Sequence, residues 1–199
     1  MSVPVAQMGT GERILAAAAQ MTAELGWSGV TMAALAERVG VSRQTVYNEW
    51  GSRDRLAEAM VLRELGAFLD EVDAGFDAHP HDLQASVADA IGRVLGLARV
   101  NPLLRAIVTA THGAETELVP LLTTRADVVI AVASERVRDR LVCYPGVDAA
   151  DIDITVDLLV RTVLSHVMQP SAETTTLPGG LARAVASLVS RRPAEATAR

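Results

Sequence analysis

Polar side chains with the donors and acceptors needed to read nucleic-acid bases cluster in one short stretch of this sequence. Arg43, Gln44, Thr45 and Asn48 lie within six residues of one another. Arginine can pair with guanine through two hydrogen bonds, glutamine can pair likewise with adenine, and the threonine methyl group can contact thymine. These residue types therefore predict contacts to base edges in double-stranded DNA, provided that one rigid element presents them together.

The same stretch also allows a simpler interpretation. Arg43 can be solvated, or it can pair with Glu37 or Glu49, which are acidic neighbours in the sequence. Glu49 also weakens the local positive field, although such charges usually face away from the duplex. Base reading is therefore a hypothesis about where these side chains point.

Other chemistry-bearing residues form no catalytic or metal-binding pattern. The four histidines are His79, His81, His112 and His166. They show no HExxH motif, no regular spacing with carboxylates and no cysteine partner. The only cysteine, Cys143, excludes an intramolecular disulfide and indicates a reducing compartment. With no glycine-rich phosphate loop either, we expect no enzymatic activity, no catalytic residue, no metal and no cofactor.

The spacing of small and apolar residues around the polar cluster predicts a helix-turn-helix over residues 31–50. Counted from residue 32, Ala36, Gly40 and Val46 occupy the fifth, ninth and fifteenth positions. Ala36 allows a second helix to cross closely, Gly40 can adopt the positive φ of a tight turn, and Val46 can pack back onto the first helix. The motif would therefore hold the polar side chains on one short helix.

Hydroxyl residues mark where the helices of this motif begin. Thr31 and Ser42 are expected N-caps of its two helices. The second helix would then start at Arg43 and present its first turns to the DNA major groove. The helix N-termini at Thr31, Ser42 and Arg53 can in addition bind phosphates through hydroxyl, amide and charge.

Composition favours an all-α protein. Of the 199 residues, 50% are hydrophobic but only 3% are aromatic, so small aliphatic residues dominate. The net charge of −6 argues against non-specific coating of nucleic acid, so a DNA contact must come from a local basic surface. No leader and no membrane-length apolar run are recognised, and we expect a soluble, cytoplasmic protein without membrane contact.

Helical periodicity extends along the chain, without an alternating strand pattern or an internal repeat. Together with the helix-turn-helix it predicts about nine helices, the others lying at residues 11–25, 53–78, 81–100, 102–111, 117–142, 149–168 and 177–191. The expected organisation is a flexible arm, a DNA-binding domain, a larger helical domain and a flexible tail, at residues 1–10, 11–52, 53–191 and 192–199.

The N-terminal third of the chain resembles a known family. The matching residues are Ile14, Leu15, Ala17, Ala18, Gly26, Trp27, Thr31, Ser42, Thr45, Val46, Tyr47, Trp50, Ser52, Arg53 and Leu56. In this register they are similar to the N-terminal region of the TetR family of bacterial transcriptional repressors. The resemblance implies that Tyr47 contacts the DNA backbone, whereas the alternative is a half-buried aromatic residue that only packs the turn. Beyond about Leu65 the resemblance is one of length and helix count.

Three residues depart from the family pattern. Thr22 stands where a large apolar residue is usual, Trp50 where phenylalanine is common, and Arg53 where lysine is usual. We expect Trp27 and Trp50 to supply the volume that Thr22 withholds. Arg53 keeps the positive charge, and its planar fork suits a phosphate.

The larger half carries isolated polar groups among aliphatic helices, a composition typical of a small-molecule pocket. The resemblance implies such a pocket, in which an inducer changes the spacing of two recognition helices; the alternative is a solid aliphatic core. Few aromatic residues favour an elongated aliphatic ligand, fatty-acyl or alkane-like, with Arg125 or Arg161 meeting a polar head. The expected ligand-binding residues are Phe68, Val72, Leu95, Leu104, Ile107, Thr111, His112, Arg125, Val129 and Arg161.

Helix 149–168 is apolar nearly all round, so it must be covered on both sides. The family resemblance implies that this helix and the last one form a four-helix interface with a second copy, while the alternative is that both only close the core of one chain. The expected interface residues are Leu159, Val163, His166, Val167, Leu181, Val185 and Leu188.

These expectations combine into one predicted function. The chain would be a homodimeric repressor that binds a palindromic double-stranded DNA operator and is released by a small apolar effector. The alternative is a helical small-molecule binding or carrier protein whose helix-turn-helix has lost its DNA affinity.

Overall fold

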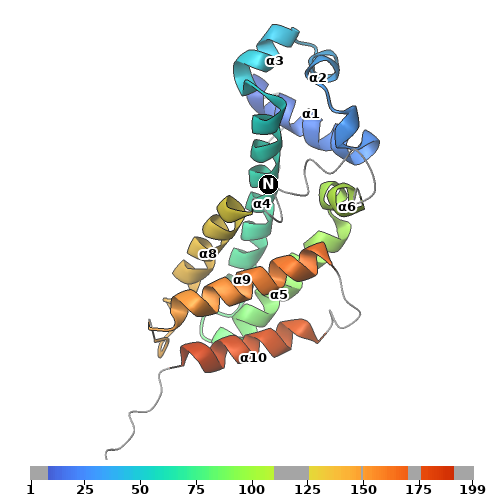
Figure 1. Ribbon diagram of the computed structural model, residues 1–199. Coiled ribbons are helices and arrows are strands. Elements are labelled where there is room, and N and C mark those ends of the chain that lie inside the picture. Colours follow the sequence, from blue (N-terminus) through green and yellow to red (C-terminus); the bar gives the residue numbers. More distant parts are fainter. Residues whose placement is uncertain (1–8, 110–125, 149, 170–175, 191–199) are drawn as a thin grey trace, which may run out of the picture. The chain divides into compact units, whose positions relative to one another are not determined.

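The computed structural model describes residues 9–109, 126–148, 150–169 and 176–190 (Figure 1). Within these ranges it contains nine α-helices and one short 3-10 helix. The only β-type pairing that they contain is an isolated bridge between Val147 and Ser190. The predicted all-α class is confirmed.

The helix boundaries follow the predicted periodicity to within a few residues wherever both can be compared. The elements are α1 (Thr10–Leu25), η2 (Trp27–Gly29), α2 (Met32–Val39), α3 (Arg43–Trp50), α4 (Arg53–Ala78), α5 (Leu83–Val100), α6 (Pro102–Thr109), α8 (Asp127–Leu141), α9 (Ile152–Met168) and α10 (Leu177–Val189). Helix 117–142 is the exception: Ala126 lies in a turn and α8 begins at Asp127, ten residues after the predicted start, which itself lies outside the described residues.

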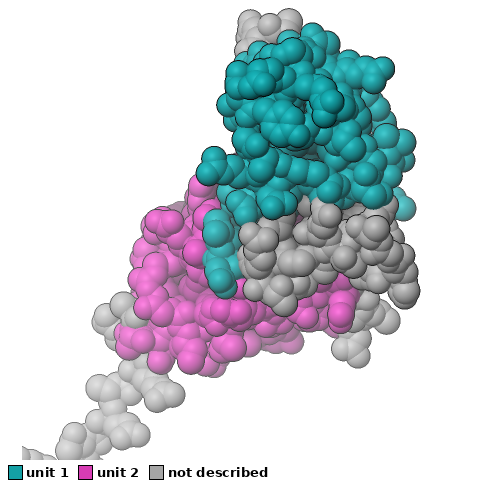
Figure 2. All heavy atoms as spheres, turned by 45° about the horizontal axis from the view of Figure 1, so that its top comes forward, with its two compact units in different colours: residues 1–67, 100–129 teal, residues 68–99, 130–199 magenta. Residues whose placement is uncertain are grey.

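Packing divides the chain into two compact units, which are coloured separately in Figure 2. Unit 1 comprises Met1–Ala67 and Val100–Val129, and unit 2 comprises Phe68–Arg99 and Ile130–Arg199. The division therefore falls within α4, whereas the sequence suggested a domain boundary after residue 52. The reason is that Leu56 and Met60, in the first half of α4, are fully buried in the core of unit 1.

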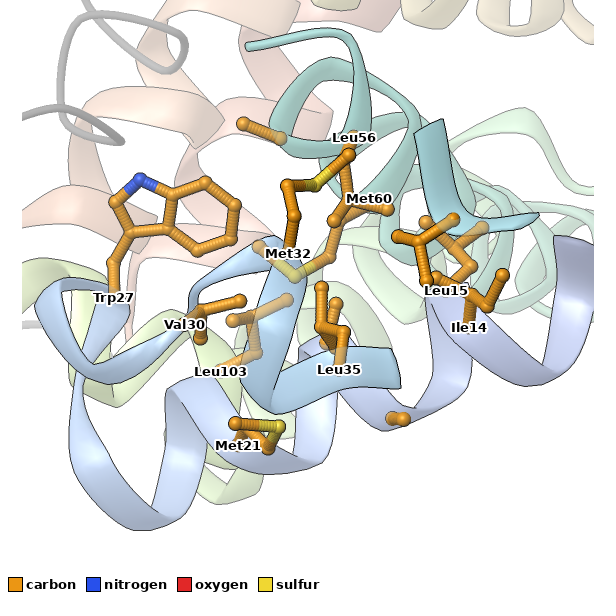
Figure 3. Close-up of a cluster of buried hydrophobic side chains, with 14 of the residues drawn as sticks. Ile14, Leu15, Met21, Trp27, Val30, Met32, Leu35, Leu56, Met60 and Leu103 are labelled. Carbon is orange, nitrogen blue, oxygen red and sulfur yellow. The ribbon is translucent and has the colours of Figure 1, made fainter. Parts of the chain in front are cut away.

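The core of unit 1 combines aliphatic side chains with methionines and Trp27 (Figure 3). Thr22 is buried there, where its Oγ1 donates to the Ala18 carbonyl at 2.8 Å and lies 3.8 Å from the Met60 sulfur. Trp27 is buried in the same core and Trp50 packs at its edge. The hydroxyl of Thr22 is thus satisfied within its own helix, and Met60 fills the space beside it.

The core of unit 2 depends on a very close approach between α4 and α5. A Cβ atom added to Gly75 would lie 2.4 Å from the backbone nitrogen of Ala90. No side chain fits at that distance, so only glycine permits this crossing. Tyr144 closes the end of the same core, where its hydroxyl donates to the His79 carbonyl at 3.0 Å and contacts the Ser86 hydroxyl.

Ion pairs join α4 to α8 on the surface of unit 2. Arg136 pairs with Asp73, and Arg140, one helical turn further along, pairs with Asp77. The Arg140 guanidinium also lies 5.5 Å from the ring centre of Phe76. Its pairing with Asp77 raises the pKa of Arg140 above its ordinary value, so this arginine stays charged.

Candidate DNA-binding surface

The turn between α2 and α3 has the geometry that its residue spacing predicted. Gly40 has φ 74° and ψ 40°, and its N–H donates to the Ala36 carbonyl at 3.0 Å. Ala36 is buried, as the close crossing of two helices requires, and Val46 is fully buried on the inner side of α3. The helix-turn-helix prediction is confirmed in its local geometry.

Hydroxyl side chains cap the three helices that begin at this surface. Thr31, Ser42 and Ser52 each accept the backbone N–H three residues further on, at 3.1, 3.0 and 3.2 Å respectively. These caps leave other N–H groups at the first turns of α2, α3 and α4 available to an anion, and the helix dipoles favour negative charge there. Phosphate binding at such N-termini is therefore physically favoured.

A hollow of about 480 Å³ opens where these helices begin. Its lining residues are Ser28, Thr31, Met32, Ala33, Arg43, Tyr47, Gly51, Ser52 and Arg53. The hollow brings together four of the residues predicted to bind DNA, namely Thr31, Arg43, Tyr47 and Arg53. Sequence reasoning did not select Ser28, Gly51 or Ser52 as site residues. Of these three, only Ser52 carries a sequence signal, because it is among the residues that match the family pattern.

Arg53 has a second role that the sequence did not reveal. Its Nε donates to the Val30 carbonyl at 2.9 Å, and one terminal nitrogen donates to the Trp27 carbonyl. The guanidinium also lies 4.5 Å from the ring centre of Trp27. The fork expected to suit a phosphate is thus engaged with the backbone around η2, and Arg53 contributes its charge to the hollow from that fixed position.

The exposed side of α3 carries polar side chains that are held in place by one another. Gln44 Nε2 donates to Asn48 Oδ1 at 2.8 Å, and the hydroxyls of Ser42 and Thr45 lie 2.8 Å apart. Arg43, Gln44 and Asn48 are exposed, opposite the buried Val46. The arrangement has the inward and outward faces expected of a recognition helix.

The end of α3 is attached to the start of α1. Trp50 Nε1 donates to the Gly11 carbonyl at 3.3 Å. The Glu49 carboxylate lies beside the same residue, with one oxygen 2.8 Å from where a Gly11 Cβ would be. Glu49 is therefore placed near the positive end of the α1 dipole, which accounts for an acidic residue on the recognition helix.

Two arginines hold the C-terminal end of α2. Arg13 of α1 donates to the Val39 carbonyl at 2.9 Å. Arg38 pairs with Glu24 at 2.8 Å, and this hydrogen bond and charge lower the pKa of the Glu24 carboxyl. These contacts fix α2, and through the turn they fix the orientation of α3.

The predicted ligand-binding residues are described only in part. Thr111, His112 and Arg125 lie outside the described residues, as does the side chain of Ile107 in α6. Phe68, Val72 and Leu95 are buried or partly buried in unit 2, and Leu104 and Val129 are buried in unit 1. Pocket lining by these residues stays a prediction.

Arg161 lies on the surface of α9, and its contact with a ligand stays a prediction. This arginine was expected to meet a polar ligand head within the helical domain. Its side chain is 59% exposed, and its Nε donates to Asp157, one turn earlier on α9, at 2.8 Å. An i,i+4 ion pair on the helix surface explains this position, because residues four apart share one helix face.

The predicted dimer residues also divide differently from expectation. Leu159 and Val185 are 6% and 4% exposed and belong to the core of unit 2, while Val163, Val167 and Leu181 pack against that core. His166 is partly buried, with its Nδ1 2.8 Å from the Thr162 carbonyl. Among the seven, Leu188 is the exposed large apolar residue, at 47%.

The free apolar side chains of α9 lie on its opposite face. Ile154 is 62% exposed and Leu158 is 52% exposed, one helical turn apart. The expectation that this helix is apolar on two sides is therefore met. Leu159, which was expected at the dimer interface, faces the core of unit 2, and its neighbour Leu158 is the exposed leucine. The interface itself stays a prediction. The two leucines are neighbours of the same type, so composition could not distinguish them.

The described ranges contain neither a metal-binding cluster nor a helix that could span a membrane. They contain no group of three or more histidine, cysteine, aspartate or glutamate side chains that could hold a metal ion. None of the helices described here is long and apolar enough to cross a membrane.

A capped helix-turn-helix with an outward polar face, beside a hollow formed by helix N-termini, defines a DNA-binding regulator class. Comparison with known families agrees. The family described as "Bacterial regulatory proteins, tetR family" matches residues 14–60, and "Bacterial Tetracyclin repressor, C-terminal domain" matches residues 82–191. The chain belongs to the TetR family of bacterial transcriptional regulators. Regulators of this family bind DNA, often form homodimers that respond to small-molecule effectors, and are generally not enzymes.

Individual relatives extend the likeness over most of the chain. The HTH-type transcriptional regulator AlkX of Mycobacterium tuberculosis is 28% identical over 166 residues, which cover 83% of this chain and 78% of that protein. The solved structure of the TetR family repressor AlkX from Dietzia sp., implicated in biodegradation of n-alkanes, gives a TM-score of 0.75 at 26% identity, covering 92% of this chain and 96% of that one. The repressor QsdR of R. erythropolis, at 20% identity and a TM-score of 0.62 over 92% of this chain and 96% of its own, shares the fold.

Proposed function

We propose that this TetR-family regulator is a dimeric repressor that binds a palindromic operator in the bacterial cytoplasm and is released by a small aliphatic effector. The observation that carries the DNA-binding part is the hollow at the N-termini of α2 and α4, next to the exposed polar face of α3. In this proposal the hollow binds the phosphate backbone and α3 reads bases.

The two roles require different chemistry. Thr31 and Ser52 lie at helix N-termini, and Tyr47 adds a phenolic hydroxyl on a side chain that is 44% exposed. Such groups position a protein on DNA without distinguishing sequences. Gln44 has the donor and acceptor that discriminate one base pair from another. Because the whole chain has a net charge of −6, the local attraction must come from the positive ends of these helices together with Arg43 and Arg53.

A second copy of this chain is the proposed occupant of the exposed apolar face of unit 2. Helices α9 and α10 lie side by side (Figure 1). Ile154 and Leu158 on α9 and Leu188 on α10 are exposed. Covering these side chains would remove apolar surface from water, which is favourable by roughly 25 cal/mol of free energy per Å² buried. A two-fold dimer would present two α3 helices, which matches a palindromic operator.

The effector would act by thermodynamic coupling. A ligand that binds the DNA-incompetent arrangement better than the DNA-competent one lowers operator affinity by that difference in free energy. An aliphatic ligand is favoured because the chain has only 3% aromatic residues. A further reason is that the similar Dietzia protein is implicated in biodegradation of n-alkanes.

Selection of bound sequences from random DNA duplexes tests the first part. We expect a palindromic site, and affinity for that site should fall steeply with salt because phosphate contacts release counterions. Tyr47→Phe should weaken binding to all sequences alike, whereas Gln44→Ala should remove the preference at one base position. Recovery of no preferred sequence would refute the operator proposal and favour a ligand carrier instead.

Effector coupling needs its own measurement. Straight-chain fatty acids and alkanes of increasing length can be added to the protein–operator complex at fixed salt. We expect one length range to lower operator affinity by at least fivefold, the lower end of typical coupling. If a ligand binds at saturation and leaves operator affinity unchanged, it is not the effector.

A further inference from the structure

The recognition helix contains a hydrogen bond between two exposed amide side chains. Gln44 Nε2 donates to Asn48 Oδ1 at 2.8 Å. The two residues are four apart, so they lie on one face of α3, and both are turned away from the buried Val46. Both had been expected to contact bases independently.

The orientation of an amide decides what it can read. A glutamine amide has nearly the same shape after a half turn about its last torsion, but the turn exchanges donor and acceptor. Adenine presents the N7 acceptor and the N6 donor in a fixed order, whereas guanine presents two acceptors. Only one of the two amide orientations therefore makes both hydrogen bonds to adenine at a given position.

We propose that Asn48 is a positioning residue that holds the Gln44 amide in its adenine-reading orientation. Asn48 Oδ1 accepts one N–H of Gln44, so reversing the Gln44 amide alone would set its oxygen against another oxygen; both amides must turn together before the reversed orientation regains a hydrogen bond. Gln44 keeps its own oxygen and its second N–H for the base. This proposal rests on the DNA-binding function proposed above, and it predicts adenine at one position of each half-site.

The surroundings of the pair support this division. The Thr45 hydroxyl is engaged with Ser42, and the Glu49 carboxylate lies beside Gly11 at the start of α1. Asn48 is thus the acceptor placed one turn from Gln44 on the exposed face. In the free protein, water competes for this hydrogen bond, but in a DNA groove water is displaced and the same bond becomes stronger. Its effect therefore belongs to the bound state, where the base is read.

The test measures base preference at every operator position for four variants. These are Gln44→Ala, Asn48→Ala, Asn48→Asp and the double variant Gln44→Ala/Asn48→Ala. We expect Asn48→Ala to reduce the adenine preference at the Gln44 position on the order of fivefold, out of the tenfold or more that a bidentate contact provides. The double variant should match Gln44→Ala at that position. Glu49→Gln is the matched control, because Glu49 is an exposed residue of α3 that lies beside Gly11, so its loss should leave the base preference at this position unchanged.

Asn48→Asp separates positioning from direct contact. Aspartate keeps an acceptor oxygen at the same place, so it should restore the adenine preference. Its negative charge should lower affinity for all sequences by a similar factor. If Asn48 instead donates to a base or a phosphate, Asn48→Asp cannot restore the adenine preference, because aspartate has no N–H. That result would overturn the proposal.

Two other outcomes would also overturn the role of Asn48. In one, Asn48→Ala keeps the adenine preference and relaxes a different position, which makes Asn48 an independent reader. In the other, Asn48→Ala weakens binding to every DNA sequence equally, which makes Asn48 a contact to the DNA backbone. A wild-type protein that selects no sequence would instead refute the proposed DNA-binding function, so the two failures are distinguishable.

Discussion

The helices of unit 1 are joined mainly by side chains that bind backbone, with one exposed ion pair between Glu24 and Arg38, whereas α4, α5 and α8 of unit 2 are joined by close backbone approach and by ion pairs. In unit 1, α2 and α3 have eight residues each, a length at which isolated helices do not form in water. Hydroxyl caps and arginine-to-carbonyl hydrogen bonds satisfy their ends. In unit 2, α5 and α9 have 18 and 17 residues, and the contact of Gly75 with Ala90 sets one helix crossing.

This difference explains why the contacts of unit 1 are easier to predict from the sequence than those of unit 2. Caps, a positive-φ glycine and fixed spacings are local signals, because their partners lie within a few residues. A close helix crossing or an ion pair between helices depends on a partner far away in the chain. Mutations in the two units should therefore reduce stability by different amounts and for different physical reasons.

The largest effect is expected for Gly75→Ala in unit 2. The added methyl group would lie 2.4 Å from the Ala90 nitrogen, so the α4–α5 crossing must open. Overpacking of this kind costs about 3 kcal/mol of unfolding free energy, measured by urea denaturation. Gly92→Ala in α5 is the control, because its Cβ would meet no atom within 4 Å. It should stabilise the protein by up to about 1 kcal/mol, since alanine has the higher helix propensity. Equal destabilisation by both variants would contradict the close-crossing argument.

Arg53→Ala should have the next largest effect, and in unit 1. It removes hydrogen bonds to the Trp27 and Val30 carbonyls and the contact with the Trp27 ring. Hydrogen bonds from a charged donor stabilise a protein more than neutral ones do. We therefore expect the free energy of unfolding, measured by thermal unfolding, to fall by about 2 kcal/mol. DNA affinity should fall for all sequences alike. Arg53→Lys keeps the charge without the fork, and it should therefore recover DNA affinity more fully than stability.

Loss of a helix cap should be smaller. Thr31→Ala and Ser42→Ala each remove one side-chain acceptor from a helix N-terminus. Each should cost about 1 kcal/mol of stability, while Thr31→Ser retains the acceptor and should cost little. Chemical denaturation of the three variants checks this order. Ser42→Ala should also loosen Thr45, whose hydroxyl contacts that of Ser42.

The smallest effect concerns the pair of Glu24 and Arg38. Because Arg38 lowers the pKa of Glu24, the folded state favours the charged carboxylate. The stability from this pair is fully present above the ordinary glutamate pKa and is lost as pH falls through the lowered value. Unfolding curves of wild type and Glu24→Gln should therefore differ near neutral pH and converge in acid. The difference should shrink at high salt, because both side chains are exposed. If the stability difference between wild type and Glu24→Gln persisted in acid, the substitution would be acting through packing and not through the charge of Glu24.

The fold and the helix-turn-helix could be predicted because their signals are local. Gly40 needs a positive φ, Thr31 and Ser42 are caps, and the α4 boundaries coincide with the predicted 53–78. The hollow was predicted only in part, since Ser28 and Gly51 reach it through tertiary placement. The ion pair of Arg161 with Asp157 follows an i,i+4 spacing in the sequence, but that spacing alone does not distinguish a surface ion pair from a ligand contact.

Which face of α9 is exposed could not be predicted from the sequence. On a helix that is apolar all round, periodicity does not say which side faces the chain's own core. Leu158 and Leu159 have the same side chain and opposite exposure, and only the packing of α9 on its neighbours distinguishes them. The same limit applies to Arg53, whose carbonyl partners in Trp27 and Val30 are more than twenty residues away in sequence.

The stacking of Arg53 on Trp27 has an evolutionary consequence. A planar guanidinium is favoured at position 53 because it lies over a flat ring while it binds two carbonyls of the same segment. If an ancestor lost the ring at position 27, the stacking advantage of a guanidinium at position 53 would be lost, and a lysine there would cost less than it does beside Trp27. The two positions should therefore change together among descendants of one ancestral sequence, although 25 residues separate them.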